Sequence, residues 1–456
     1  MIPIPIFKNW FHNRQSQIRE AYFEFLRFAS ISADSTYKND CLRCADWLVA
    51  FFRKEKIAAQ RIETSTLPIV FAEELSAGQG RPTLLFYGHY DVQPVDPIEL
   101  WDSPPFDPTE RDGAIYARGA VDDKGQIFYA ILAVACWKDL GYALPMNCKF
   151  CIEGEEEFHS TGLAKKLPEL KNELKADYLL VVDFDALDPD MPAITLGARG
   201  LTSLEVTLKG SKGDLHSGMY GGIAYNPNRA LVELLSKLWD QNGVVQVPGF
   251  YDHVIDPSSD EIKKFKWGHN ASYYTTHFGI QAFGGEKGKS LQVANCFRPT
   301  LELNGIVGGY TGPGIKTVIP AQAQAKITCR LVPGQDPDRI CNQIADFLKK
   351  HTVQGMSIEF VKHQGAKAFR GNVPSPLATA IAQAAFEVTG NPCHYLLSGG
   401  SIPIVPDLIA ASNAEMIGMG YGLISDRIHA PNEHFDMHRL EQGFLTIARA
   451  LCLYPK

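Results

Sequence analysis

The chain has 456 residues, of which 45% are hydrophobic, and its 44 basic and 51 acidic side chains give a formal net charge of -7. That length predicts two or three domains, and the apolar fraction is sufficient for ordinary globular cores. Because acids and bases are interleaved without a basic stripe, we expect neither nucleic acid nor a membrane among its partners.

The N-terminal residues 1–13 include apolar side chains but no long hydrophobic segment and no small-residue cleavage site. Nowhere do about 18 apolar residues follow one another, as a membrane-spanning helix would require. The ten cysteines are scattered, which favours reduced and mostly buried thiols over a disulfide framework. Two C-x-x-C pairs, Cys41/Cys44 and Cys148/Cys151, lack zinc-ribbon spacing, and we interpret them as core residues. We therefore expect a cytoplasmic protein.

The first part of the chain alternates between helical patterns and short apolar runs. Helical spacing of apolar residues occurs in residues 19–29, 41–54 and 126–137. Continuous apolar runs, typical of buried strands, occur in residues 83–87, 149–152 and 178–182. This alternation predicts an α/β domain whose central mixed sheet is flanked by helices.

The pattern changes after Leu196-Gly197-Ala198-Arg199-Gly200. Residues 204–208 and 325–331 alternate like half-exposed antiparallel strands, and residues 228–238 and 338–349 have helical spacing. These features predict an inserted α+β domain.

A loop rich in Gly, Asn and Pro, residues 364–376, closes the insert, and helices are expected at 377–389 and 438–453. We therefore assign residues 1–198 and 371–456 to an α/β catalytic domain. Residues 199–370 form the inserted domain.

Possible metal ligands gather in five segments that follow or flank apolar runs. These are His89-Tyr90-Asp91, Asp122-Asp123, residues 153–157, Asp183-Phe184-Asp185 and His429-Ala430-Pro431-Asn432-Glu433. Taken singly, each is more often a turn, a helix cap or a solvated acidic loop. In open α/β sheets, however, ligands collect beyond the carboxyl ends of strands, where we place four of the five segments. Imidazoles with a surplus of carboxylates favour a pair of Zn²⁺-like ions.

The spacing within these segments predicts distinct tasks. His89 and Asp91 are two apart in an extended segment, so Asp91 lies on the side where it can accept the second ring N–H of the histidine. Asp122 or Asp123 could cap the following helix, but two adjacent acids exceed what one cap needs. In extended backbone Glu156 and Glu157 point apart, so one could bind metal while the other addresses a bound water.

Three motifs carry a resemblance to a known family. They are Tyr87-Gly88-His89-Tyr90-Asp91-Val92-Gln93-Pro94, Trp101-Asp102-Ser103-Pro104-Pro105-Phe106 and Arg118-Gly119-Ala120-Val121-Asp122-Asp123-Lys124-Gly125. They closely resemble the dinuclear-zinc exopeptidases, which include carnosine-type dipeptidases, aminoacylases, bacterial glutamate carboxypeptidases and succinyl-diaminopimelate desuccinylases. The resemblance covers nearly the whole chain.

The resemblance implies a complete dinuclear site of two divalent ions per subunit, Zn²⁺ or alternatively Mn²⁺, with a water between them. The metal ligands it implies are His89 and Asp183 for one ion, Glu157 and His429 for the other, and Asp122 as the bridge. It further makes Asp91 the orienting acid and Glu156 the general base. A cis peptide bond is expected between Asp122 and Asp123.

Four further motifs look most like the dipeptidase branch. They are Asp214-Leu215-His216-Ser217-Gly218, Lys316-Thr317-Val318-Ile319-Pro320, Arg330-Leu331-Val332-Pro333 and Gly399-Gly400-Ser401-Ile402-Pro403. The likeness implies that Arg330, near Thr317 and, after lid closure, Ser401, binds the carboxylate of a small peptide. It also implies that the insert is a lid through which the chain forms a homodimer, and that His216 reaches the partner's active site. Phe158-His159 replaces the small residues that usually follow the paired glutamates.

We therefore expect a dinuclear metallo-hydrolase that cleaves dipeptides or short peptides with a free C-terminal carboxylate. The alternative within the family is an N-acyl-amino-acid deacylase, which needs the same metals. A two-metal phosphoesterase would need basic residues around its substrate, whereas these motifs are acidic and apolar. A catalytically inactive binding protein would lack a ligand or the base, and none is missing from the sequence.

Overall fold

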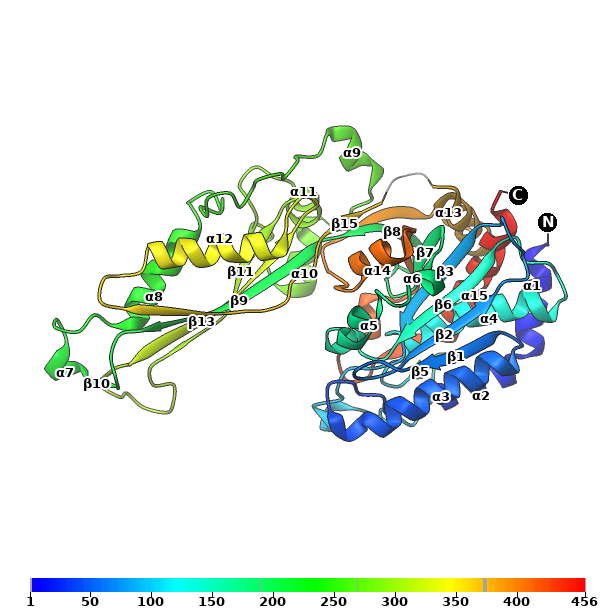
Figure 1. Ribbon diagram of the computed structural model, residues 1–456, viewed down its shortest axis with the longest axis horizontal. Helices are drawn as coiled ribbons and strands as arrows, with labels where there is room; N and C mark the ends of the chain where they lie inside the picture. The colour runs from blue at the N-terminus through cyan, green and yellow to red at the C-terminus, as the bar shows by residue number, and fades with distance from the viewer. Residues whose placement is uncertain (1, 190, 269, 372–374, 456) are drawn as a thin grey trace. The chain divides into compact units, whose positions relative to one another are not determined.

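The computed structural model describes residues 2–189, 191–268, 270–371 and 375–455, which form two compact units (Figure 1). Unit 1 comprises Met1–Gly197, Gly371–Leu396 and Ile404–Lys456, and unit 2 comprises Ala198–Arg370 and Leu397–Pro403. From the sequence pattern we expected residues 397–403 in the catalytic domain. They group with unit 2 because Gly399 and Ser401 hydrogen-bond to arginines of that unit.

Unit 1 is built on a mixed sheet flanked by helices, which confirms the predicted fold class (Figure 1). Its strands are ordered β1-β2-β6-β3-β7-β17-β8, and β16 also pairs with β8. Their bounds are β1 (Ala58–Ile62), β2 (Ile69–Glu74), β3 (Thr83–His89), β6 (Asn147–Glu153), β7 (Tyr178–Val181), β8 (Ala193–Ala198), β16 (His394–Ser398) and β17 (Glu415–Gly420). The central strands β6, β3, β7 and β17 pair in parallel, so their carboxyl ends share one edge.

The helices of unit 1 bury aromatic and aliphatic side chains against this sheet and one another. They are α1 (Ile4–Asn13), α2 (Gln15–Leu26), α3 (Lys38–Lys54), α4 (Lys124–Asp139), α5 (Thr161–Lys166), α6 (Lys171–Leu174), α13 (Pro376–Thr389), α14 (Val405–Ser412) and α15 (Met437–Leu453). Helix α4 is buried from Lys124 to Trp137, because it contacts β3, α2 and α15. Its apolar residues therefore surround the whole helix. Helix α1 was not predicted from the sequence, although Phe7, Trp10 and Phe11 form a short buried stripe along it.

Short elements complete unit 1. A small sheet has the order β18-β5-β4, with bounds β4 (Thr109–Arg111), β5 (Ala114–Tyr116) and β18 (His434–Asp436). The 3₁₀ turns are η1 (Ser35–Tyr37), η2 (Ile98–Leu100), η3 (Glu156–Phe158) and η5 (Ile424–Asp426).

Unit 2 contains an antiparallel sheet of order β11-β13-β9-β14, packed against helices. These strands are β9 (Gly200–Lys209), β11 (Thr300–Gly308), β13 (Gln322–Leu331) and β14 (Ser357–Lys362). Buried residues alternate along β9 and β13, which is the predicted half-exposed pattern. Their buried faces join α8 (Pro227–Leu235) and α12 (Pro337–Lys350) in one hydrophobic core.

The remaining elements of unit 2 are short. They are β10 (Leu215–His216), α7 (Ser217–Tyr220), η4 (Ser236–Leu238), α9 (Ser259–Lys264), α10 (Ala271–Phe278), α11 (Leu291–Cys296), β12 (Val318–Ile319) and β15 (Phe369–Arg370). Strands β10 and β12 pair as a separate two-stranded ribbon.

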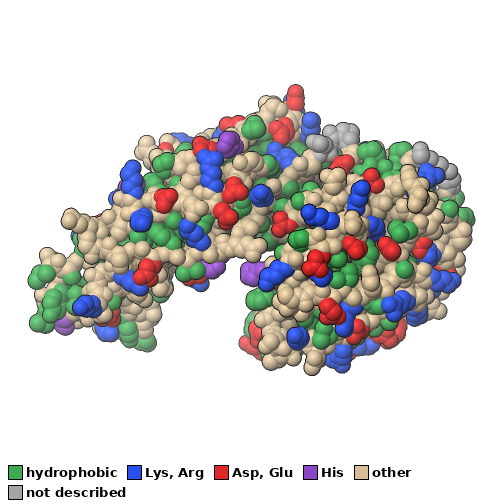
Figure 2. Space-filling model, viewed as in Figure 1, with side chains coloured by type: hydrophobic (Ala, Val, Ile, Leu, Met, Phe, Trp, Pro, Cys, Tyr) green, Lys and Arg blue, Asp and Glu red, His purple; other side chains and the backbone are tan. Residues whose placement is uncertain are grey.

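The distribution of surface charges and the state of the cysteines agree with the expectations from composition. Acidic and basic side chains are interspersed on the face shown in Figure 2. Across the described residues, no helix combines the length and apolar character needed to cross a bilayer. All ten cysteines are free thiols and eight of them are buried, including the four in C-x-x-C pairs.

Candidate metal centre

Three of the predicted ligand segments follow parallel strands of unit 1. His89 ends β3, Glu153 ends β6, and Asp183 lies two residues after β7. Because these strands are parallel and adjacent, their ends bring the polar residues to one edge of the sheet. We expected four of the five segments at strand ends, and the structure places three there. Asp122 lies in the loop that leads directly into α4, in agreement with its expected place before a helix. The edge therefore receives three segments from strands, while Asp122 and His429 arrive from loops.

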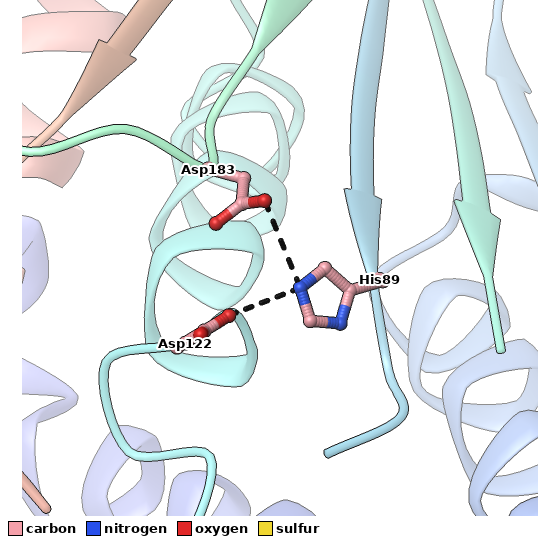
Figure 3. Close-up of side chains that lie close together, drawn as sticks. All are labelled: His89, Asp122 and Asp183. Atoms are coloured by element: carbon pink, nitrogen blue, oxygen red, sulfur yellow. Dashed lines mark hydrogen bonds and ion pairs between the residues drawn. The ribbon is translucent and has the colours of Figure 1, made fainter. Parts of the chain in front are cut away.

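One ligand group consists of His89, Asp122 and Asp183 (Figure 3). The Nε2 atom of His89 lies 3.1 Å from Oδ1 of Asp122 and 3.8 Å from Oδ2 of Asp183. The Nδ1 atom of His89 lies 3.0 Å from the backbone oxygen of Asp91. A carbonyl oxygen only accepts, so Nδ1 carries a proton and the Nε2 position is the one that faces both carboxylates.

A second ligand group consists of Asp122, Glu157 and His429. The Nε2 atom of His429 lies 2.9 Å from Oδ2 of Asp122 and 3.2 Å from Oε1 of Glu157. Asp122 thus belongs to both groups and turns a different oxygen to each histidine. This is the arrangement of a carboxylate that bridges two cations.

The donor atoms fit a pair of divalent metal ions. Within each group, one ligand atom from each residue lies within 4.8 Å of the others, a spacing that one ion can span. Imidazole nitrogens and carboxylate oxygens are the donors that Zn²⁺ takes in catalytic sites. All five predicted ligands therefore come together.

The electrostatics of the centre favour cations. Burial and the charge of Asp122 raise the pKa of Asp183 to about 7. Burial also raises the pKa of Glu157, and the negative charge of Asp122 adds to that rise. Burial alone would raise the pKa of Asp122, but hydrogen bonds from His429 and His89 outweigh it and hold that pKa low. Closely spaced carboxylates repel one another, and cations between them would relieve the repulsion.

Asp91 holds three functional groups at once. Its Oδ1 lies 3.3 Å from Nδ1 of His89, and its carboxylate accepts backbone N–H groups from Glu156 at 3.2 Å and Glu157 at 3.1 Å. Ser32 Oγ donates a further hydrogen bond of 2.6 Å. Asp91 therefore couples the orientation of His89 to the turn that carries the paired glutamates.

Glu156 and Glu157 lie in the 3₁₀ turn η3, not in the extended backbone that we expected. The hydrogen bonds from their backbone N–H groups to Asp91 hold this turn. Successive residues of a 3₁₀ helix are about 120° apart around its axis, so the two side chains still diverge. Glu157 faces His429, while burial raises the pKa of Glu156.

Glu433 supports the bridging aspartate and was not assigned a role from the sequence. Its buried carboxylate accepts N–H groups from Gly119 (2.9 Å), Val121 (3.0 Å) and Asp122 (3.1 Å). It also pairs with the buried guanidinium of Arg118 at 2.7 Å. The only sequence signal was its place in the His429 segment. Glu433 thus fixes the loop from which Asp122 projects.

Asp123 also supports the metal centre, through a hydrogen bond to the backbone of the ligand His89. The Asp122–Asp123 peptide bond is cis, as expected. The Oδ2 atom of Asp123 accepts the backbone N–H of His89 at 3.0 Å. A Cβ atom at Gly88 would lie 2.3 Å from that Oδ2, so this approach requires glycine at position 88.

The predicted residues of unit 2 fall into two separate places. Arg330, at the end of β13, donates to Ser401 Oγ at 2.9 Å. The backbone oxygen of Thr317 instead accepts the N–H of Ser217, beside exposed His216. Thr317 is not near Arg330, because β13 alone places its two ends about 30 Å apart. Our expectation that they lie together is wrong within one chain.

Two exposed aromatic side chains follow the paired glutamates. Phe158 is 48% exposed, and its ring lies 5.4 Å from that of His159. Both side chains lie directly after Glu157 in the sequence.

Comparisons with known proteins identify metallopeptidases as relatives of this chain. Residues 85–452 match peptidase family M20/M25/M40. The chain is 31% identical to Beta-Ala-His dipeptidase of Homo sapiens, over 83% of this chain and 76% of that protein. It is 28% identical to the Cys-Gly metallodipeptidase dug1 of Schizosaccharomyces pombe, over 93% of this chain and 92% of that protein. An M20 family metallo-carboxypeptidase structure from Sulfolobus solfataricus matches with a TM-score of 0.85 and 31% identity, over 96% and 99% of the two chains.

Replacing Glu433 by glutamine tests its supporting role. The amide keeps the shape but leaves buried Arg118 without a charged partner and turns a donor toward backbone N–H groups. We expect a loss of about 3 kcal/mol in the free energy of unfolding, together with lower metal content. The control is Glu169→Gln, which removes an exposed pair with Lys166 and should cost about 1 kcal/mol or less. Wild-type stability and metal content in Glu433→Gln would contradict this role.

Proposed function

The chain belongs to peptidase family M20/M25/M40 and is a hydrolase, and from this premise we propose the reaction that it catalyses. We propose metal-dependent hydrolysis of the peptide bond in dipeptides or short peptides that have a free C-terminal carboxylate. Two dipeptidases and a metallo-carboxypeptidase among the relatives support this substrate class.

The observation that carries the proposal is the sharing of Asp122 between two complete ligand groups. Two divalent ions held there would polarise the scissile carbonyl and lower the pKa of a water toward about 7. We propose Zn²⁺ as the metal, with Mn²⁺ as the alternative, since nitrogen and oxygen donors accept both. Asp91 and Glu433 would keep the ligand geometry fixed while the substrate reacts.

Glu156 is the proposed general base. It shares the turn η3 with the ligand Glu157 but points elsewhere, so it is free of the task of holding metal. Its carboxylate would accept a proton from the attacking water and pass it to the leaving amine. Both transfers require one group beside the metals, and the place of Glu156 next to the ligand Glu157 supports that assignment.

Arg330 is the proposed anchor for the substrate's C-terminal carboxylate. Its guanidinium is half-buried and its Nη1 atom is positioned by Ser401. A guanidinium binds a carboxylate through two parallel hydrogen bonds, so it selects a free C-terminus. The deacylase alternative would use the same metals and the same carboxylate, but no relative reported above carries that activity in its name.

We also propose a homodimer formed through unit 2. Hydrophobic side chains gather at the end of unit 2 that carries β10 and α7 (Figure 2). Large apolar residues there include Met219 (67% exposed), Ile223 (80%) and Ile315 (97%). An exposed cluster of this kind is typical of an interface. A second copy of the chain would cover it.

His216 lies at that end of unit 2 and would act in the partner's site. Its Nδ1 accepts the N–H of Gly218 at 3.0 Å, so the ring proton of a neutral imidazole lies on Nε2. An exposed N–H donor of this kind can stabilise the oxyanion that forms during attack. Thr317 sits next to it and would contribute to the same shared site.

We propose the cytoplasm as the location. All ten cysteines are free, and burial raises the pKa of several of these thiols, for example Cys44 to about 11. Unreactive, unpaired thiols suit a reducing compartment.

Glu156→Gln tests the hydrolytic mechanism. The variant should keep both metals and lose about 10²-fold or more in kcat on a dipeptide, because an amide cannot accept the proton. Its neighbour provides the control, since Glu157→Gln should lose metal as well as activity. Metal analysis and kinetics on dipeptides and on N-acetyl amino acids measure both effects. Normal turnover by Glu156→Gln would exclude it as the base, and preference for the N-acetyl amino acids would favour the deacylase.

Mixing two inactive variants tests the action of His216 across a dimer. Heterodimers of Glu156→Gln and His216→Ala chains contain one site with both groups intact, so partial activity should return. Each homodimer alone is the control. Absence of activity in heterodimers verified by differential tagging would contradict the assignment.

A further inference from the structure

A second arginine stands next to the proposed carboxylate anchor. Arg199 precedes β9, and its Nε donates to the backbone oxygen of Gly399 at 2.9 Å. Ser401 Oγ donates a short hydrogen bond to the backbone oxygen of Arg199 and accepts one from Arg330 Nη1 at 2.9 Å. Both arginines therefore hold the same loop, residues 399–401, from within unit 2.

Arg199 is buried and forms no ion pair with any described residue, and the exposed acid Glu302 acts on it only electrostatically, without a direct contact. The residue is only 8% exposed, and its Nη1 atom is buried with no hydrogen-bond partner. Among the described residues, no ion pair joins Arg199 or Arg330 to an acid. Other arginines of unit 2 contrast with this, since Arg298 pairs with Glu286 and Arg370 with Glu261.

Two neighbouring guanidinium groups without an ion-pair partner are unfavourable, even though Glu302 offsets part of the charge of Arg199. Burial lowers the pKa of Arg199 to about 10, and the charge of Arg330 contributes to that shift. A buried charge without an ion-pair partner is destabilising, and a neighbouring like charge increases that destabilisation. An anionic ligand that reaches both guanidiniums would remove both penalties.

A purely structural role does not account for the unpaired nitrogen. The hydrogen bond from Nε to Gly399 would hold the loop even if Nη1 were absent. A neutral side chain could donate the same hydrogen bond without burying a charge. The spare donor beside Arg330 instead matches the second oxygen of a carboxylate.

We propose that Arg199 is a second guanidinium for the substrate's C-terminal carboxylate and that it acts together with Arg330. This inference rests on the proposed function, which supplies a substrate with a free carboxylate. Arg330, positioned by Ser401, orients the substrate's carboxylate. Arg199 adds a second positive charge from the buried side of the site. Selection of a free C-terminus then depends on both residues, and replacement of either alone leaves a residual preference.

Equilibrium binding separates this role from catalysis. The probes are L-alanylglycine and its C-terminal amide, titrated calorimetrically into metal-loaded Glu156→Gln protein, in which turnover is suppressed. Adding Arg199→Gln should weaken binding of the carboxylate form about tenfold or more, as expected for loss of a charge-assisted hydrogen bond, and leave the amide form unchanged. Arg199→Lys, which keeps the charge, should lose less. Arg339→Gln, which removes an exposed arginine of the same unit, is the matched control and should bind both probes normally.

A double-mutant comparison distinguishes direct contact from action through the loop. In an Arg330→Gln background, Arg199→Gln should remove the remaining preference for carboxylate over amide. If it has no further effect there, Arg199 acts only through Arg330, and the proposal is overturned. An equal loss for both probes in Arg199→Gln would overturn it as well, as would equal binding of the two probes before any arginine is changed.

Failure of the proposed hydrolysis gives a different result. A wild-type protein that binds L-alanylglycine through its carboxylate but does not cleave dipeptides would refute the activity and leave the two-arginine site standing.

Discussion

The position of one carboxylate, that of Asp122, constrains the rest of unit 1. Its two oxygens face different histidines, so both ligand groups depend on it. A shift of a few tenths of an ångström would disturb both groups together. The surrounding structure is built to prevent that shift. Glu433 accepts three backbone N–H groups of the loop that carries Asp122, and that loop leads into α4, which is buried from Lys124 to Trp137.

The centre concentrates negative charge that the fold alone does not balance. Asp122, Asp183, Glu156 and Glu157 lie with two imidazoles at the edge of the sheet where the parallel strands end, and burial raises the pKa of Asp183, Glu156 and Glu157. Supporting contacts instead preserve geometry: Asp91 fixes His89 and the glutamate turn, and Asp123 fixes the backbone of His89. Bound cations would offset the repulsion among these carboxylates. The supporting contacts hold the carboxylates close together in spite of that repulsion.

Local patterns were sufficient to predict much of this arrangement. His89 and Asp91 were paired by their spacing along a strand, and the buried runs that became β3, β6 and β7 predicted that polar ends would meet. The specific ligand set came from motif resemblance. Long-range contacts were beyond reach, because Glu433 lies 311 residues from the Asp122 N–H that it binds. The turn η3 depends on Asp91, 65 residues earlier, and so no local signal marked it. Thr317 and Arg330 are only about a dozen residues apart in the sequence, yet the long strand β13 separates them in space.

Metal stoichiometry in aspartate variants tests the shared carboxylate most directly. Wild-type protein dialysed against limiting Zn²⁺ should retain two equivalents per chain, because two ligand groups are present. Asp183→Asn removes a ligand from one group and should retain about one equivalent, whereas Asp122→Asn weakens both groups and should retain little of either. Circular dichroism establishes that each variant is folded before its metal is counted. Retention of two equivalents by folded Asp122→Asn, or loss of both by Asp183→Asn alone, would contradict a centre organised around Asp122.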